Sequence, residues 1–344
     1  MSHPYRIYEV LLLATVALSW ACVPLIRRYS LASGLIDTVG VRSSHAVPTP
    51  RGAGLGIAIA VVCSVLVSAF LGIVPWRPSL AIVCGGAMVA AIGWFDDHRS
   101  LSARRRIAVH FVAAGFALWL IGAPHVLMFG SRAIAAGPLA WPLGLLAIVW
   151  SLNAYNFMDG VDGLAGIEAV SVASFAAAIL VSSGHAAVAF MAALVAAAAA
   201  GFLPWNWPPA RIFMGDVGSG FLGFVFAVVA FWSESAGGLS ALAWSGLLAL
   251  FVVDATVTLA RRVLRRERFY EAHRQHAYQR LYHQANWSHR RIVVSVFACN
   301  LILAVIVASG WYGSRLGIAT GTCFALAIIG YAWVERIAPM PTGG

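Results

Sequence analysis

Two long apolar runs of this chain are separated by the polar stretch NAYNFMDGVDGLA, residues 153–165. Asn153, Asn156, Asp159 and Asp162 follow one another at intervals of three residues, so they can share one side of a helical turn. Polar side chains are costly near a bilayer and need a functional reason to be there. A helix break with Asx turns would explain one Asp-Gly pair but not two. The stretch therefore predicts one wall of a site for phosphate and metal.

The composition on either side of this stretch is that of a membrane protein. Of the 344 residues, 61% are hydrophobic and 10% are charged, and the mean hydropathy is +0.83; soluble domains carry about 25% charged residues. A spanning helix needs about 20 apolar residues, and the chain has many such runs. We therefore predict an all-α polytopic protein with one membrane domain over 1–344. We also expect no cleaved signal peptide. The eleven expected spans of the chain are 5–26, 53–74, 79–95, 106–123, 138–153, 164–182, 186–204, 217–232, 239–260, 291–311 and 315–334.

The distribution of arginine predicts the orientation of these spans. The chain has no lysine, and 19 of its 23 basic residues fall in loops on one side, nine of them in or at the edge of the basic loop 261–290. Basic loops face the cytoplasm, so we expect the N-terminus outside. The net charge of +10 is explained by topology and contact with membrane lipids, and we expect no nucleic-acid partner.

The carboxylates fall on the same side as the arginines. A transporter would be expected to place its polar chemistry near the bilayer midplane, so this clustering at one surface indicates an enzyme site instead. The cytoplasmic acids are Asp37, Asp96, Asp97, Asp159, Asp162, Asp216, Glu267 and Glu271.

Two further cytoplasmic loops carry acids in patterns that suggest catalysis. Asp96 and Asp97 are adjacent at the end of an apolar span, where two carboxylates repel each other and invite a cation. One could hold a metal-bound phosphate while the other acts as a base; a solvated helix end is the alternative. Asp216 lies in Gly-Asp-Val-Gly-Ser at the start of another span, which suggests an anion site at a helix N-terminus and a metal ligand. An ordinary N-cap would give the same pattern.

The basic loops supply candidate phosphate and sugar contacts. His45 and Arg51 lie in the first cytoplasmic loop, a Pro- and Gly-rich turn region. His273, Arg274 and His276 lie in the fifth. The two histidines are three residues apart, but no H-E-x-x-H pattern accompanies them, and the site as a whole is rich in carboxylates and therefore suited to magnesium rather than zinc.

Taken together and in this order, the loops resemble the bacterial polyprenyl-phosphate N-acetylhexosamine-1-phosphate transferases over about residues 5 to 334. Within that superfamily, the run HRQHAYQR at 273–280 looks like the subgroup that starts O-antigen synthesis with an N-acetylated 6-deoxy amino sugar. The family more often has a His-x-His-His cluster there. The motifs that carry the resemblance are Phe95-Asp96-Asp97 with Leu101-Ser102-x3-Arg106, Asn153-x2-Asn156-x2-Asp159-Gly160-x-Asp162-Gly163-Leu164-Ala165, and Gly215-Asp216-x-Gly218-Ser219-x2-Leu222-Gly223.

The resemblance implies transfer of a sugar-1-phosphate from a UDP-N-acetylamino sugar to undecaprenyl phosphate at the bacterial inner membrane, with release of UMP. It also implies Mg²⁺, with Mn²⁺ as a substitute, and it leaves a homodimer open. Asp216 would be the main metal ligand, with Asp96 or Asp97 assisting and the other of the pair acting on the lipid phosphate. The nucleotide or metal pocket would be lined by Asn153, Asn156, Asp159 and Asp162. Phosphate or sugar contacts would come from His45, Arg51, Arg106, His273, Arg274 and His276.

Three rival functions are considered from the sequence. A magnesium-dependent membrane prenyltransferase also uses paired aspartates, but it predicts no Gly-Asp-x-Gly-Ser loop. A lipid-linked-sugar transporter predicts more charge within the spans and internal repeats. A non-catalytic scaffold would not need five cytoplasmic aspartates in Gly- and Asn-rich loops.

Overall fold

A computed structural model describes residues 3–38, 47–123, 126–129, 132–267 and 273–341. It is helical with two short antiparallel ribbons, which confirms the predicted all-α class. The elements are α1 His3–Ser33, β1 Ile36–Asp37, β2 Thr49–Pro50, α2 Gly54–Phe70, α3 Trp76–Leu80, the π-helical η1 Ala81–Gly85, α4 Gly86–Arg99, α5 Ala103–Ile121, β3 Val126–Phe129, β4 Arg132–Ala135, the 3₁₀ turn η2 Gly137–Leu139, α6 Ala140–Phe157, α7 Leu164–Ser182, α8 Ala186–Asn206, α9 Asp216–Ser235, α10 Ala241–Leu247, α11 Ala249–Leu264, α12 Ala277–His283, α13 His289–Tyr312 and α14 Leu316–Ile337.

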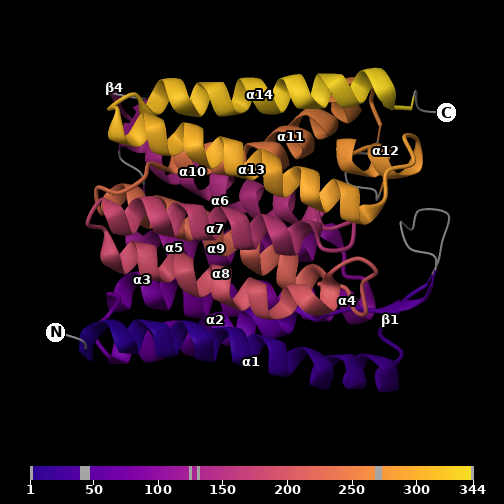
Figure 1. The fold of residues 1–344 in the computed structure, drawn as a ribbon, viewed down its shortest axis with the longest axis horizontal. Helices are drawn as coiled ribbons and strands as arrows, with labels where there is room; N and C mark the ends of the chain where they lie inside the picture. The colour runs from indigo at the N-terminus through magenta and orange to yellow at the C-terminus, as the bar shows by residue number, and fades with distance from the viewer. Residues whose placement is uncertain (1–2, 39–46, 124–125, 130–131, 268–272, 342–344) are drawn as a thin grey trace.

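The long helices lie side by side in one bundle, with α1 along one edge and α14 along the opposite edge (Figure 1). The two chain ends lie at opposite ends of the bundle. β1 and α12 lie at the end where the C-terminus lies. Segments far apart in the sequence therefore meet at that end, which we call the site end.

Each of the eleven predicted ranges contains helix, but not every one is a simple span. Among the described residues, eight helices are long and apolar enough to cross a membrane, and a ninth candidate is α10 with α11, bent by 86° at Leu248. Within the predicted span 53–74, the helix α2 has only 17 residues, which is short for a span. Helix α5 has three arginines among its first four residues, which makes its start too polar for a span. The chain is a multi-pass membrane protein, and the count of eleven spans stays a prediction.

Among the candidate membrane spans, helix α9 is the most buried. Its glycines and those of α2 and α4 let the three backbones approach closely. A Cβ on Gly93 of α4 would lie 2.6 Å from the Asp216 carbonyl oxygen, and a Cβ on Gly54 of α2 would lie 2.2 Å from Gly218 Cα. Small residues permit this packing inside a membrane, where there is no hydrophobic force between helices. The contact of α4 with α9 brings the Asp96-Asp97 motif next to the Asp216 motif.

One buried polar pair joins α7 to α13. Asn300 Nδ2 donates to Glu168 Oε2 at 2.7 Å and lies 2.8 Å from Ser171 Oγ. Glu168 Oε1 and Asn300 Oδ1 are both buried acceptors without a donor among the described residues. Because an ionised carboxylate with an unpaired oxygen is costly to bury, we expect Glu168 to be neutral, and its proton would provide a donor that the carboxylate lacks.

We expect Asn300→Ala to lower the free energy of unfolding by about 1–2 kcal/mol, the range for a hydrogen bond between helices in a membrane. Glu168→Gln keeps both a donor and an acceptor and should change stability little. Thermal unfolding of the detergent-solubilised protein measures both. Equal destabilisation by the two variants would contradict a neutral Glu168.

Candidate active site

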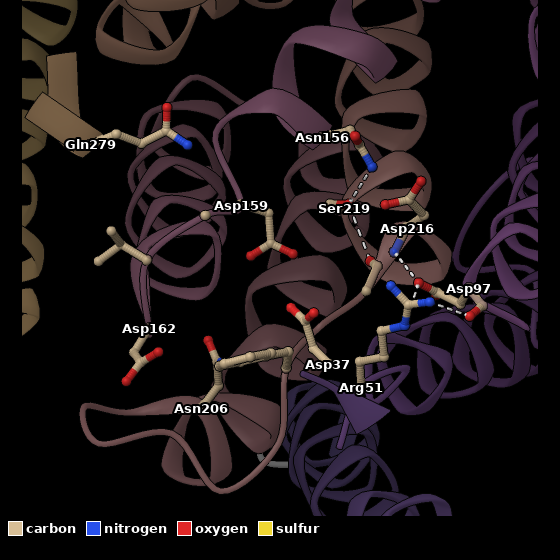
Figure 2. A pocket seen from close by; sticks show the side chains of 14 residues that line it. Asp37, Arg51, Asp97, Asn156, Asp159, Asp162, Asn206, Asp216, Ser219 and Gln279 are labelled. Carbon is tan, nitrogen blue, oxygen red and sulfur yellow. Dashed lines mark hydrogen bonds and ion pairs between the residues drawn. The ribbon is translucent and has the colours of Figure 1, made fainter. Parts of the chain in front are cut away.

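A polar cavity of about 310 Å³ opens at the site end of the bundle (Figure 2). Its walls come from β1, the residue after β2, the ends of α4, α6 and α8, the start of α9, Gln279 of α12, the turn after α6 and the loop before α9. Five of its side chains are carboxylates and one, Arg51, is a guanidinium. The lining residues are Asp37, Arg51, Asp97, Asn156, Asp159, Gly160, Val161, Asp162, Asn206, Phe213, Gly215, Asp216, Ser219 and Gln279.

Asp97 is buried where α4 meets the start of α9. Its Oδ1 and Oδ2 each accept a backbone N–H from α9, from Asp216 and Val217, both at 3.3 Å. The carboxylate therefore satisfies amides that a helix N-terminus leaves unpaired. Arg51 Nε lies 3.8 Å from Asp97 Oδ1. A Cβ on Gly215 would lie 2.6 Å from Asp97 Oδ2, so only glycine fits beside this contact.

Asp96 and Asp216 are joined by one arginine. Arg106 Nη1 lies 2.6 Å from Asp96 Oδ2 and 3.0 Å from Asp216 Oδ2. The other oxygen of Asp96 accepts the Leu101 N–H at the turn between α4 and α5. Asp96 therefore lies behind the cavity wall, while Asp97 and Asp216 line it.

The opening stretch of the sequence forms the facing wall. Asn156 Nδ2 donates to Ser219 Oγ at 2.9 Å, which ties α6 to α9. Asn153 instead donates to the Val149 carbonyl of its own helix and lines a small neighbouring cavity with Arg106. Burial raises the pKa of Asp159 well above its ordinary value, and the charges of Asp216, Asp97 and Asp162 raise it further.

The two aspartates of this stretch point in different directions. Figure 2 shows the carboxylates of Asp37 and Asp159 pointing into the cavity and that of Asp162 pointing away from it. Asp162 Oδ2 accepts the Ala210 N–H at 2.9 Å and lies 3.2 Å from His289 Nδ1. Asp162 thus contacts the loop before α9 and the start of α13, a role that the regular spacing in the sequence does not reveal.

The short helix α12 contributes Gln279 to the cavity. The Oε1 atom of Gln279 accepts the His276 N–H at 3.3 Å. Next to it, Tyr278 OH donates to the Phe157 carbonyl at the end of α6, at 2.9 Å. A Cβ on Gly160 would lie 2.3 Å from this hydroxyl and 3.2 Å from Gln279 Nε2. The glycine therefore lets α12 dock on the turn after α6.

Six of the predicted site residues that the structure describes do not line this cavity. Three of them, Asp96, Arg106 and Asn153, lie beside it as described above, and the other three, His273, Arg274 and His276, belong to the fifth loop. His276 is buried, and its Nδ1 lies 3.2 Å from Asp254 Oδ1. His273 lies beside His276, with ring centroids 4.8 Å apart and ring planes tilted by 32°. Burial, followed by the nearby His276 and Arg262, lowers the pKa of His273 to about 3. Arg274 is also outside the lining, and His45 lies outside the described residues.

Sequence reasoning missed several lining residues. Asp37 is predicted only as a cytoplasmic acid, because nothing in its local pattern links it to Asp159. Gln279 lies in the 273–280 run, where the predicted contacts are the histidines and Arg274. Asn206 at the end of α8 and Phe213 in the loop before α9 reach the cavity only through the fold.

The donor set of the cavity suits a hard divalent cation. Its possible ligands are carboxylate and amide oxygens, the kind that Mg²⁺ prefers, and no hydrogen-bond donor from the described residues reaches the Asp159 carboxylate. In the described part of the chain, no three acidic, histidine or cysteine groups form a ready-made metal cage. Mg²⁺ is commonly held by one or two carboxylates together with substrate phosphates, so this arrangement fits a cation that is bound with a phosphorylated substrate.

Comparison with known proteins gives consistent matches. A family model described as glycosyl transferase family 4 matches residues 79–234. A probable undecaprenyl-phosphate N-acetylglucosaminyl 1-phosphate transferase of Bacillus subtilis is 30% identical over 82% of this chain and 79% of its own length. The decaprenyl-phosphate N-acetylglucosaminephosphotransferase of Mycobacterium tuberculosis is 27% identical over 96% and 89%. A phospho-N-acetylmuramoyl-pentapeptide-transferase of Synechococcus is 32% identical over 86% of each chain.

We expect Gly160→Ala to destabilise the protein by about 1–3 kcal/mol, the usual cost of overpacking. Its new methyl group would collide with the Tyr278 hydroxyl. Tyr278→Phe removes that oxygen, so the double variant should recover part of the loss. Thermal unfolding of the two single variants and the double variant measures the coupling; strictly additive effects would contradict the contact.

Proposed function

The chain belongs to glycosyl transferase family 4 and is a glycosyl-1-phosphate transferase that acts on a polyprenyl phosphate, and from this membership we propose its substrates and cofactor. The donor is a UDP-N-acetylamino sugar and the acceptor is undecaprenyl phosphate. A phosphate oxygen of the acceptor attacks the sugar-linked phosphorus of the donor. The bond from that phosphorus to UMP breaks, which gives undecaprenyl-diphosphate-sugar and UMP.

The observation that carries the proposal is the acidic cavity at the site end. Both substrates are anionic, and a cavity with five carboxylates and one arginine would repel them without a cation. Asp216 and Asp97 are the proposed ligands, with Asp159 facing the same space. A bound Mg²⁺ would neutralise charge on the donor diphosphate. Mn²⁺ would substitute for it.

The protein's own side chains supply binding and orientation around that cation. Arg51 lines the cavity, so its guanidinium can contact phosphate oxygens, a geometry for which arginine is well suited. Arg106 is paired with Asp216 from behind the cavity wall and holds that carboxylate in place. Asn156 and Gln279 present amides to the donor. Asp97 keeps the start of α9 in place through two backbone hydrogen bonds.

A second cavity suits the lipid tail of the acceptor. It has a volume of about 280 Å³, lies among α6, α9, α10 and α11, and is mainly apolar, with Trp150, Phe226, Phe231 and Trp244 in its walls. An isoprenoid chain is apolar and gains from burial against such side chains. The bend of 86° between α10 and α11 is next to this cavity.

The proposed setting is the cytoplasmic face of a bacterial inner membrane, with the N-terminus outside. There the product would start a surface glycan of the O-antigen type. The 273–280 run supports this assignment through its resemblance to that subgroup. Membership of the family decides against the prenyltransferase and transporter alternatives.

Purified protein with Mg²⁺ and undecaprenyl phosphate should release UMP from at least one UDP-N-acetylamino sugar. The panel includes UDP-N-acetylglucosamine, its 6-deoxy relatives and UDP-N-acetylmuramoyl-pentapeptide. Excess EDTA should abolish release, and added Mg²⁺ or Mn²⁺ should restore it. Turnover only with the pentapeptide donor would contradict the surface-glycan assignment, and turnover in EDTA would contradict the cation.

Asp216→Asn should lower kcat by about 100-fold or more, the scale for losing one group that stabilises developing charge. The unfolding temperature should stay near that of the wild type, because the asparagine can still accept from Arg106. Glu9→Gln, an exposed carboxyl change near the N-terminus of α1, is the matched control and should leave kcat unchanged. Retained activity in Asp216→Asn would remove Asp216 from the proposed metal site.

A further inference from the structure

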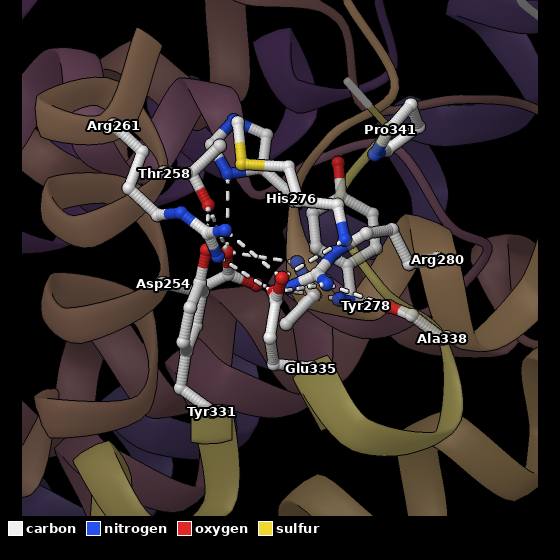
Figure 3. Close-up of polar contacts among 12 residues, drawn as sticks. Asp254, Thr258, Arg261, His276, Tyr278, Arg280, Tyr331, Glu335, Ala338 and Pro341 are labelled. Atoms are coloured by element: carbon white, nitrogen blue, oxygen red, sulfur yellow. Dashed lines mark hydrogen bonds and ion pairs between the residues drawn. The ribbon is translucent and has the colours of Figure 1, made fainter. Parts of the chain in front are cut away.

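The end of the last helix carries a charge cluster centred on Glu335 (Figure 3). Arg261 on α11 donates from Nη1 and Nη2 to the two oxygens of Glu335, at 2.6 and 2.9 Å. Arg280 on α12 donates from Nη1 to Glu335 Oε2 at 2.7 Å. One carboxylate thus joins α11, α12 and α14.

Arg280 depends on this carboxylate more than Arg261 does. The Arg280 side chain is 0% exposed, whereas that of Arg261 is 28% exposed. Arg280 Nη1 also donates to the Ala338 carbonyl at 2.6 Å, and its guanidinium lies 5.2 Å from the Tyr331 ring centroid. Its Nε and Nη2 groups have no acceptor among the described residues. Because a buried charge without a partner is very costly, Glu335 determines whether Arg280 can stay in place.

The start of α12 is bound to α11 through Asp254. Its carboxylate accepts the Ala277 N–H at 2.9 Å and the Tyr278 N–H at 3.3 Å, and Thr258 Oγ1 donates to it at 3.0 Å. Asp254 therefore caps the start of α12, and Glu335 holds its middle. A helix of seven residues has little stability of its own, so these two carboxylates set its position.

The position of α12 matters because the helix forms part of the cavity wall. Gln279 lines the cavity, and Tyr278 holds the Phe157 carbonyl just before the turn that contains Asp159 and Gly160. Glu335 itself does not line the cavity. No residue of α12 lines the apolar cavity assigned to the lipid tail.

We propose that Glu335 is a positioning residue for the nucleotide-sugar donor, acting through Arg280 and α12. This inference rests on the proposed function above for the identity of the donor. It assigns a role in donor binding to the C-terminal helix, which lies outside the matched family region. The acceptor lipid should be insensitive to Glu335, because no residue of α12 lines its cavity.

The test compares Glu335→Gln with the wild type. Glutamine keeps the size of the side chain but cannot neutralise the two guanidiniums. We expect the KM for the UDP-sugar to rise about tenfold, a size typical of residues that act on a site through a contact network. The KM for undecaprenyl phosphate and kcat should stay within about twofold of the wild-type values. A donor KM equal to the wild-type value would overturn the proposal, as would a parallel change of both KM values.

Arg265→Gln is the matched control. Arg265 also binds the C-terminal segment, donating to the Pro341 carbonyl at 2.7 Å, but within the described part of the chain none of its hydrogen bonds goes to α12. Its donor KM should equal that of the wild type. Arg280→Lys provides a second variant in case Glu335→Gln does not fold: it keeps the charge but shortens the reach to Glu335, and it should raise the donor KM selectively. An unchanged donor KM in Arg280→Lys would overturn the proposal.

Hydrogen exchange separates this inference from the proposed function. In Glu335→Gln, or in Arg280→Lys if the first variant does not fold, amides 276–283 should exchange faster than in the wild type. Exchange in α7 and α8 should be unchanged. Faster exchange in a protein that turns over no UDP-sugar would leave the positioning of α12 supported and the proposed donor wrong. Unchanged exchange at 276–283 would overturn the role of Glu335 whatever the activity.

Discussion

The close contact between α4 and the start of α9 is the constraint on which the site depends. Gly93 faces the backbone of Asp216 with no room for a Cβ, and Asp97 accepts two N–H groups of α9. Polar groups near a bilayer need partners that water does not supply. Here the carboxylate of one motif satisfies the amides of the other. Packing and function are therefore joined, because the groups that orient α9 also bring its acidic residue to the cavity.

The charge of the cavity is opposite to that of the protein. The chain has a net charge of +10, yet the cavity has five carboxylates and a single arginine in its wall. Arg106 offsets part of that charge from behind through Asp96 and Asp216. Most of the basic residues lie outside the cavity, whereas the cavity wall is mainly acidic. The proposed divalent cation would offset part of the remaining negative charge.

The site is assembled from most of the chain. The matched family region, 79–234, supplies four of the five aspartates in the cavity wall, and the fifth, Asp37, comes from β1. Beyond it, α12 closes the wall with Gln279 and is held by Asp254 and Glu335 on two other helices. The histidines that draw attention in the sequence instead lie in this supporting layer, where His276 borders Asp254. We propose above that the contact of Glu335 with Arg280 lets the last helix set the position of this part of the wall.

The sequence by itself determined the all-α membrane class, the side on which the polar loops gather, and the three acidic motifs. Each of these follows from local composition and spacing, because hydropathy and arginine distribution act on one segment at a time. Only the tertiary structure decided which side chains meet. In the fold, Asp162 lies next to His289, and Asp37 faces Asp159 across the cavity. Gln279 lines the cavity, whereas His276 does not. Those outcomes depend on close helix packing and on partners more than a hundred residues away, and no local spacing carries that information.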